Sequence, residues 1–221
     1  MYFESRFVLP YSAIVLLFAF VFSNVTMAQE TIGLWTVNAP DSASQISGAF
    51  DPNSWLNVVN APVTVDEAFS GESILDEGFA NSAPGLTFEV VFNNGVINSS
   101  GDDLVLFEAQ FDAGSYSVTT DFDGHVSSLA LSFIDFVSTG ESRDYYFGNN
   151  QSGTFNADIF GLAFDLSDLG LSNGDSVTSI RFTAADTFTD PIGLGEIVPE
   201  PVSGGLLLVV FTALAGTRRR R

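Results

Sequence analysis

The chain has 221 residues, no cysteine, one histidine (His125), and 27 acidic against 7 basic residues, for a net charge of −20. These counts exclude disulfides, thiolate metal sites and multi-histidine zinc sites. The acid excess also argues against nucleic-acid binding, which needs basic surface to neutralise phosphates.

Residues 1–28 have the pattern of a secretory signal peptide. Arg6 supplies a weakly basic start, an apolar run covers 11–22, and Thr26 and Ala28 are small residues at the positions that signal peptidase reads. Cleavage after Ala28 is therefore expected, and an uncleaved membrane anchor is the alternative. The apolar run is short for a full span, which needs about 20 residues.

Residues 29–197 are expected to form one all-β domain. Short β-type runs alternate with clusters of Gly, Asn, Asp, Ser and Pro, which favours a single antiparallel β-sandwich of the jelly-roll type. The expected strands are Leu34–Asn38, Leu56–Val65, Leu86–Phe92, Leu104–Phe111, Tyr116–Phe122, Ser127–Val137, Thr154–Phe164 and Val177–Thr183.

Some local features of this domain can also be anticipated. Turns are expected at 93–95, 123–124 and 173–174, and a short helical turn that stops at Gly170 is expected from 165. Apolar residues change parity within 127–137, which predicts a bulge or burial on both faces.

The domain itself carries 25 acidic and 2 basic residues. Two interpretations fit this charge: adaptation to a saline setting, or specific calcium sites, since calcium binds six to eight oxygen ligands. The candidate calcium ligands crowd two turn-flanked strand ends: Asp102, Asp103, Glu108, Asp121 and Asp123. The alternative is that these acids only cap and solvate loops.

Weaker candidates remain open. Asp186, Asp190 and Glu196 could complete a site together with Glu30 or Asp41. Paired carboxylates could serve glycoside hydrolysis, but chance pairs are unavoidable among so many acids. His125 precedes Ser127 and Ser128 without a nucleophile-elbow motif, so an exposed turn histidine is favoured. Four aromatic residues could stack on sugars, although core packing is favoured for the tryptophans: Trp35, Trp55, Tyr145 and Tyr146.

The last 24 residues, 198–221, have three parts. Pro199, Glu200 and Pro201 precede an apolar run over 202–215, and the basic cluster Arg218, Arg219, Arg220 and Arg221 ends the chain. Such a run is expected to enter a bilayer, with the arginines held on the cytoplasmic side. A buried core helix would not explain four terminal arginines.

This tail closely resembles the PEP-CTERM sorting signal of Gram-negative bacteria. The resemblance implies recognition by exosortase, a membrane-embedded cysteine protease-transpeptidase, and cleavage near the Pro199–Pro201 motif. It implies export past signal peptidase, a transient anchor in the inner membrane, and release or transfer to the cell surface or extracellular matrix. It covers the tail and leaves the activity of the domain open.

We therefore expect a non-enzymatic matrix protein with a structural or adhesive role in biofilm or exopolysaccharide. An exposed aromatic row on one sheet would instead favour a carbohydrate-binding module that holds exopolysaccharide. A cleft with two carboxylates, one of strongly shifted pKa, would favour a secreted hydrolase. A structural or adhesive role requires no cofactor, and calcium is the only cofactor that the sequence suggests.

Overall fold

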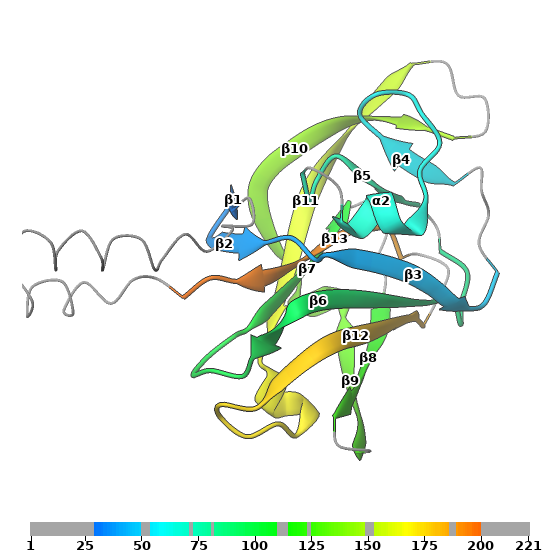
Figure 1. The fold of residues 1–221 in the computed structure, drawn as a ribbon. Helices are drawn as coiled ribbons and strands as arrows, with labels where there is room; N and C mark the ends of the chain where they lie inside the picture. The colour runs from blue at the N-terminus through cyan, green and yellow to red at the C-terminus, as the bar shows by residue number, and fades with distance from the viewer. Residues whose placement is uncertain are drawn as a thin grey trace, which may run out of the picture.

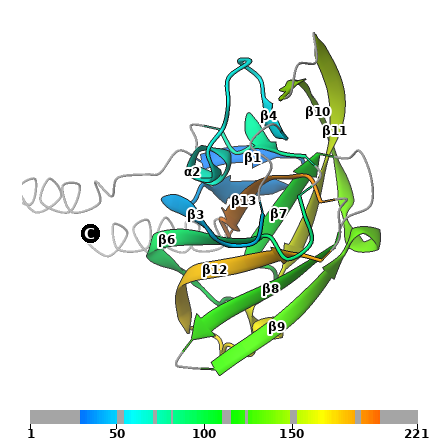
Figure 2. The same cartoon turned by 90° about the vertical axis from the view of Figure 1, so that its right-hand side faces the viewer.

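A computed structural model describes residues 29–49, 54–70, 73–80, 82–109, 115–122, 125–148, 153–185 and 189–199. Two antiparallel sheets, of eight and five strands, pack as a sandwich (Figures 1 and 2). We call the larger sheet A and the smaller sheet B. The all-β sandwich predicted from the sequence is thus confirmed. The expected signal peptide and all of the tail after Pro199 lie outside the described residues.

The order of the strands in space differs from their order along the chain in both sheets. From edge to edge, sheet A contains β1 (Gln29–Ile32), β2 (Trp35–Asn38), β13 (Pro191–Ile197), β7 (Leu104–Ala109), β11 (Thr154–Phe164), β10 (Val137–Phe147), β4 (Trp55–Asn57) and β5 (Glu77–Phe79). Sheet B contains β3 (Ser42–Ser47), β6 (Thr87–Ile97), β12 (Ser176–Ala184), β8 (Ser115–Phe122) and β9 (His125–Ser132). The helical elements are α2 (Val65–Ser70), η1 (Phe133–Asp135) and η2 (Leu166–Leu169).

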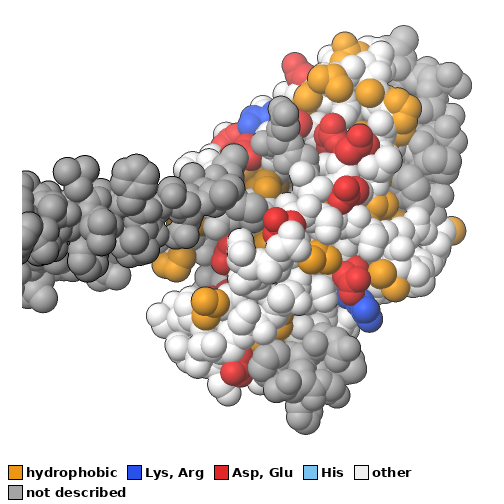
Figure 3. Space-filling view, in the orientation of Figure 1, with side chains coloured by type: hydrophobic (Ala, Val, Ile, Leu, Met, Phe, Trp, Pro, Cys, Tyr) orange, Lys and Arg blue, Asp and Glu red, His pale blue; other side chains and the backbone are white. Residues whose placement is uncertain are grey.

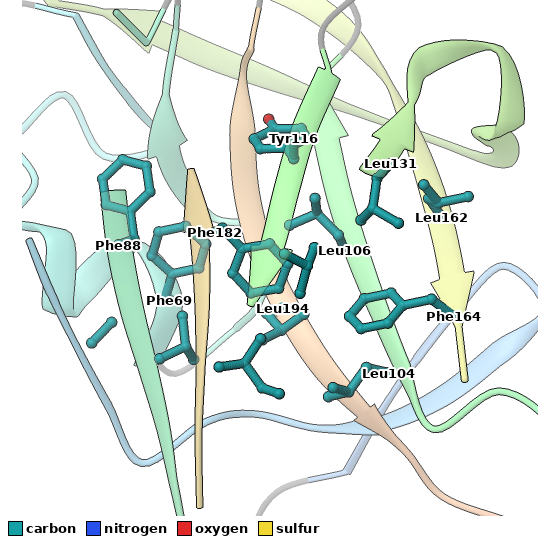
Figure 4. Close-up of a cluster of buried hydrophobic side chains, with 14 of the residues drawn as sticks. Phe69, Phe88, Leu104, Leu106, Tyr116, Leu131, Leu162, Phe164, Phe182 and Leu194 are labelled. Carbon is teal, nitrogen blue, oxygen red and sulfur yellow. The ribbon is translucent and has the colours of Figure 1, made fainter. Parts of the chain in front are cut away.

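The core between the sheets is built from alternate residues of the strands on both sides. On β7, Leu104 and Leu106 face sheet B, where Phe88 and Phe182 are almost fully buried (Figure 4). This alternation is the period-2 pattern of a strand. Burying such large side chains contributes about 1.5–3 kcal/mol each, which makes this core the main source of stability.

Sheet A is buried on its outer face as well. Val105 and Phe107 of β7 belong to a second apolar cluster, together with Val37 of β2 and the buried side chains Ile74 and Leu75. All six residues of β7 are therefore buried, as expected of a strand covered on both faces. Among the described strands, the β1–β2 hairpin pairs with sheet A only at the end of β13, and its Trp35 and Val37 side chains lie over Gly161 and Gly195 of the sheet. This hairpin and the segment around Ile74 form the outer cover.

Glycines allow the cover to approach sheet A closely. A Cβ atom built on Gly161 of β11 would lie 2.5 Å from a ring carbon of Trp35. On β13, one built on Gly193 would lie 2.4 Å from Ile74, and one on Gly195 would lie 2.7 Å from Val37. A side chain at any of these three positions would clash with the outer cover, so glycine is required there.

Several strands are found close to where the sequence placed them. The segment 154–164 matches β11, and β2, β7, β8 and β12 deviate by a few residues at their ends. The helical turn after Asp165 is also confirmed. The Asp165 carboxylate accepts the N–H of Ser167 at 2.7 Å, and Gly170 closes the turn with a φ of 89°.

The segment 56–65 was wrongly predicted to be one strand. Only β4 forms, and the chain then turns because the Asn57 side chain accepts the N–H of Val59 at 2.6 Å. Helix α2 follows from a capping box: Glu67 accepts the N–H of Thr64 at 2.8 Å, and Thr64 accepts the N–H of Glu67 at 3.2 Å.

The turn predicted at residues 93–95 is also wrong. These residues lie inside β6, where its pairing with β12 shifts between Val177 and Ser179. A bulge accommodates the extra residues, and Gly95 takes the positive φ of 72° that this irregularity needs.

The prediction of one strand over 127–137, with a bulge or burial on both faces, is wrong, because the parity change marks a break between two strands. β9 ends at Ser132, η1 occupies 133–135, and β10 begins at Val137 in the other sheet. The turn at 173–174 is confirmed, with Gly174 at a φ of 91°. The turn expected at 123–124 lies outside the described residues.

Candidate functional site

The candidate calcium ligands around β7 do not converge. Asp102 and Asp103 precede the strand, and Glu108 lies near its other end. Five residues of extended chain span about 16 Å, so Asp103 and Glu108 are far too distant to share one ion. Asp102 and Asp103 therefore lie at one end of β7, and Glu108 lies at the other.

Asp103 is a buried hydrogen-bond acceptor, only 3% exposed. Its Oδ1 accepts the N–H of Ser99 at 2.9 Å and the hydroxyl of Ser99 at 2.8 Å. Its Oδ2 accepts the N–H of Leu166, the first residue of η2, at 3.1 Å. Asp103 therefore ties the β6–β7 connection to η2, and both of its oxygens serve the fold.

Glu108 connects the two sheets. It is 2% exposed, and its Oε1 accepts the phenol hydroxyl of Tyr116 on β8 at 3.1 Å and the N–H of Asp190 at 2.7 Å. Burial, with the adjacent Glu108 and Asp190, raises the pKa of Tyr116 well above its usual value, so the phenol stays protonated as the donor.

The second acidic set from the sequence is also divided. Asp190 is buried beside Glu108, while Glu196, near the other end of β13, accepts the Asn38 amide at 3.0 Å. Glu30 accepts from Ser73 and Ile74, and Asp41 accepts the N–H of Asn93. Asp186 lies outside the described residues. The described members of this set form no common site.

The β8–β9 hairpin lies beside η2 at one end of the sandwich, as Figures 1 and 2 both show. The backbone of Asp121 pairs with Val126 in this hairpin. The side chain of Asp121 and the whole of Asp123 lie outside the described part of the chain. Of the first candidate set, Asp102 and Asp103 therefore lie nearest the hairpin that contains Asp121.

We call Asp102, Asp165 and Asp168 the acidic end. Partial burial of Asp102, and then the negative charges of Asp165, Asp103 and Asp168, raise the pKa of Asp102 above its usual value. Asp165 and Asp168 were not singled out as ligands from the sequence. The signal that could have found them is the Asp165-x-x-Asp168 spacing of the predicted helical turn, which brings both carboxylates onto one short element.

The acidic end is not a preformed metal site. Within the described ranges, no three histidine, cysteine or acidic side chains are arranged to hold a metal ion. The hypothesis of a calcium site that includes Asp121 and Asp123 stays a prediction.

Three of the four aromatic candidates pack against the apolar clusters, Trp35 and Trp55 partly buried and Tyr145 fully, and Tyr146 is partly exposed. Trp35 lies over Gly161, Trp55 packs on the inner core, and buried Tyr145 donates its hydroxyl to the carbonyl of Leu75. Burial raises the pKa of Tyr145, so it too stays protonated. In the described part of the chain, the large exposed hydrophobic side chains are all aliphatic: Leu34, Ile46, Val59, Ile97, Ile134 and Val137. The side chain of His125 lies outside the described part.

The tail candidates are described only at their start. Val198 donates its N–H to the carbonyl of Thr36 at 2.8 Å, and Pro199 follows as an exposed residue. Glu200, Pro201, the arginine cluster and Ala28 lie outside the described residues. Among the residues that are described, no helix is long and apolar enough to cross a membrane.

Comparison with protein-family models and with curated proteins finds no match to this chain.

A matched pair of substitutions, at Asp102 and at Asp103, separates charge repulsion from hydrogen bonding. Asp102→Asn removes repulsion by Asp165 and Asp168 and should stabilise the protein at pH 7 by about 0.5 kcal/mol or less, since the site is partly exposed. Asp103→Asn leaves the buried N–H of Leu166 or the partly buried N–H of Ser99 facing an amide NH2 and should cost about 1–3 kcal/mol.

The pH dependence of the stability of Asp102→Asn tests whether the charge of Asp102 destabilises the fold. A raised folded-state pKa means that ionised Asp102 destabilises the fold at neutral pH, and that this penalty fades as pH falls through that pKa. Thermal melts should therefore show the gain of Asp102→Asn at pH 7 and no gain below about pH 3. A gain of equal size at both pH values would contradict the explanation.

Calcium binding is tested by melts at matched ionic strength. If a calcium site forms, millimolar calcium should raise the Tm beyond sodium and magnesium controls, because magnesium requires tighter octahedral geometry. Asp121→Asn should abolish the excess and leave the general salt effect. Equal shifts for the three cations would show that these acids are only a solvated surface.

Proposed function

We propose that this chain is an exported protein, sorted by exosortase to the cell surface or matrix of a Gram-negative bacterium. The observation that carries the proposal is the tail: Pro199, Glu200 and Pro201, an apolar run and four terminal arginines. Signal peptidase is expected to cut after Ala28. Release then follows cleavage near the motif, and the inner membrane is a transient anchor.

The position of the motif in the fold supports this order of events. The last described hydrogen bond of the sandwich is from Val198, and Pro199 has no N–H with which to extend β13. The described strands of the sandwich therefore all end before the motif begins. Cleavage within the motif would leave each of these strands intact.

We further propose a structural or adhesive role in an exopolysaccharide matrix. Both arginines of the domain already form ion pairs: Arg143 with Glu141 at 3.0 Å, and Arg181 with Glu89 at 2.8 Å. Acidic side chains are spread over the face in Figure 3, with little basic surface between them. Such a surface supports solubility and cation-mediated contact more than tight binding to one polyanion.

The edges of sheet B support a scaffold role. At β3, the carboxylate of Asp66 on α2 accepts the N–H of Ala43 at 2.7 Å, so the helix covers that edge. At the other edge, β9 reads HVSSLALS, with no acidic, Lys, Arg or Pro residue, and among the described strands it pairs only with β8. Uncharged open edges are sites where chains add to one another. We propose that β9 pairs antiparallel with β9 of a second copy.

The jelly-roll type of the sandwich belongs to the same proposal. The chain passes between the two sheets at five of the seven connections from β6 to β13, which supports a double-sheet jelly roll.

The tail proposal is tested in a host that contains exosortase. Replacing Pro199, Glu200 and Pro201 with alanine should leave the protein in the membrane fraction with its arginines attached, as intact mass would show. Pro62→Ala, at an exposed proline outside the tail, is the matched control and should be processed normally. Mature surface protein that keeps Arg218–Arg221 would overturn the sorting proposal.

Self-association through β9 is tested by sedimentation of the mature protein. The weight-average mass should rise with protein concentration at physiological salt, where repulsion is screened. Ala130→Glu, an exposed position on β9, should abolish the rise because it places like charges across the new pair. Ser47→Glu on covered β3 should keep the rise, and a wild-type protein that stays monomeric would refute the pairing.

A further inference from the structure

The tail leaves the sandwich beside the tip of the β1–β2 hairpin. Glu196 pairs with Asn38 and Ile197 with Val37, so β13 runs toward Trp35, and Val198 bonds Thr36 one step further on. Pro199 therefore lies level with Trp35, next to the two-residue turn of Gly33 and Leu34. Figure 1 shows β2 and β13 side by side on one side of the molecule.

The surface at this exit is apolar. Leu34 is 86% exposed, the largest fraction among the large hydrophobic side chains described. Val137 is 51% exposed and pairs directly with Gly161, over which the ring of Trp35 lies. Cross-strand partners direct their side chains to the same face, so Val137 lies beside Trp35. We call Leu34, Trp35 and Val137 the exit patch.

Three carboxylates around the β1–β2 hairpin are engaged by the protein itself. Glu141 accepts the N–H of Gly33 at 3.4 Å and pairs with Arg143 at 3.0 Å. Glu196 accepts from Asn38, and Glu30 accepts from the segment around Ile74. These contacts direct the acids toward their own chain and leave Leu34 as the most prominent side chain of the turn.

The length of the tail limits how far the exit patch can lie from a bilayer. Only Glu200 and Pro201 lie between Pro199 and the start of the apolar run at Val202, so the three residue steps span at most about 10 Å of chain. The headgroup layer that this spacer must cross is itself about 5–8 Å thick on each side of the bilayer. Little length is left over, so the domain must rest against the lipid surface while its tail is inserted.

We infer that the exit patch is a membrane-docking surface, which holds the precursor against the lipid interface before its tail is cut. This inference rests on the proposed insertion of the tail. Leu34 and Val137 enter the headgroup region, and Trp35 lies at the depth that tryptophan prefers. Docking would fix the height of residues 199–201 above the bilayer, at the position a membrane-embedded protease can reach.

The experiment uses protein purified with its tail from a host that lacks exosortase, in phosphatidylcholine vesicles that carry bromine near the headgroup. The Trp55→Phe variant reports Trp35 alone, and Trp35→Phe reports Trp55 alone. Bromine should quench Trp35 at least twice as strongly as Trp55. Adding Leu34→Asp and Val137→Asp should remove that difference, whereas Val59→Asp, at an exposed aliphatic residue elsewhere, should leave it.

Resistance of the protein to carbonate extraction measures tail insertion separately. If the tail resists extraction but bromine quenches Trp35 no more than Trp55, the docking inference is overturned and the proposed sorting is unaffected. A tail that is extracted by carbonate overturns the proposed sorting, and the docking inference with it.

Discussion

The fold depends on burying β7 on both faces. Its even-numbered residues face sheet B and its odd-numbered residues face the outer cover, so one strand belongs to both hydrophobic clusters. This arrangement makes sheet A a middle layer, and it requires the outer cover to approach closely. The approach is possible only because Gly161, Gly193 and Gly195 lack side chains where Trp35, Ile74 and Val37 make contact. Replacing these glycines would separate the cover from the sheet before it disturbed the inner core.

The carboxylates of Asp103 and Glu108 can be buried in this core because each accepts hydrogen bonds. Asp103 and Glu108 accept from backbone N–H groups and hydroxyls at opposite ends of β7, and Asp190 lies beside Glu108. A buried carboxylate without such donors would cost several kcal/mol. The other acids whose burial is described lie at or near the surface, where water and salt screen them. The large net charge therefore affects solubility and association more than the architecture.

The sequence predicts elements whose signals are local. The period-2 segment of β11 and the Asp165–Gly170 turn could be read directly, because side-chain alternation and capping act within a few residues. The capping box of Thr64 and Glu67 was equally local and was overlooked, so the predicted strand 56–65 was extended to the first residue of α2. By contrast, β13 (PIGLGEI) looks like a loop, since its glycines are explained only by Ile74 and Val37, which are distant in sequence.

The candidate site shows a different limit of sequence reasoning. Asp103 and Glu108 look like neighbours in the sequence, but a strand carries its residues apart at about 3.3 Å each. A helical turn does the opposite, and it brings Asp165 and Asp168 together beside Asp102. Residues close in sequence therefore make a plausible ligand set on turns and helices and a poor one along strands.

The attachment of the tail follows from the same architecture. β13 lies between β2 and β7, so the strand that carries the tail is hydrogen-bonded on both sides and packs on both clusters. Force on the tail is thereby transmitted to the most buried part of sheet A, and a terminal edge strand would instead peel away. Pro199 then ends the pairing because it has no N–H to donate. A tail that continues from a central strand and leaves the sheet at its first proline is compatible with the proposed membrane insertion and cleavage, because neither would loosen the described strands.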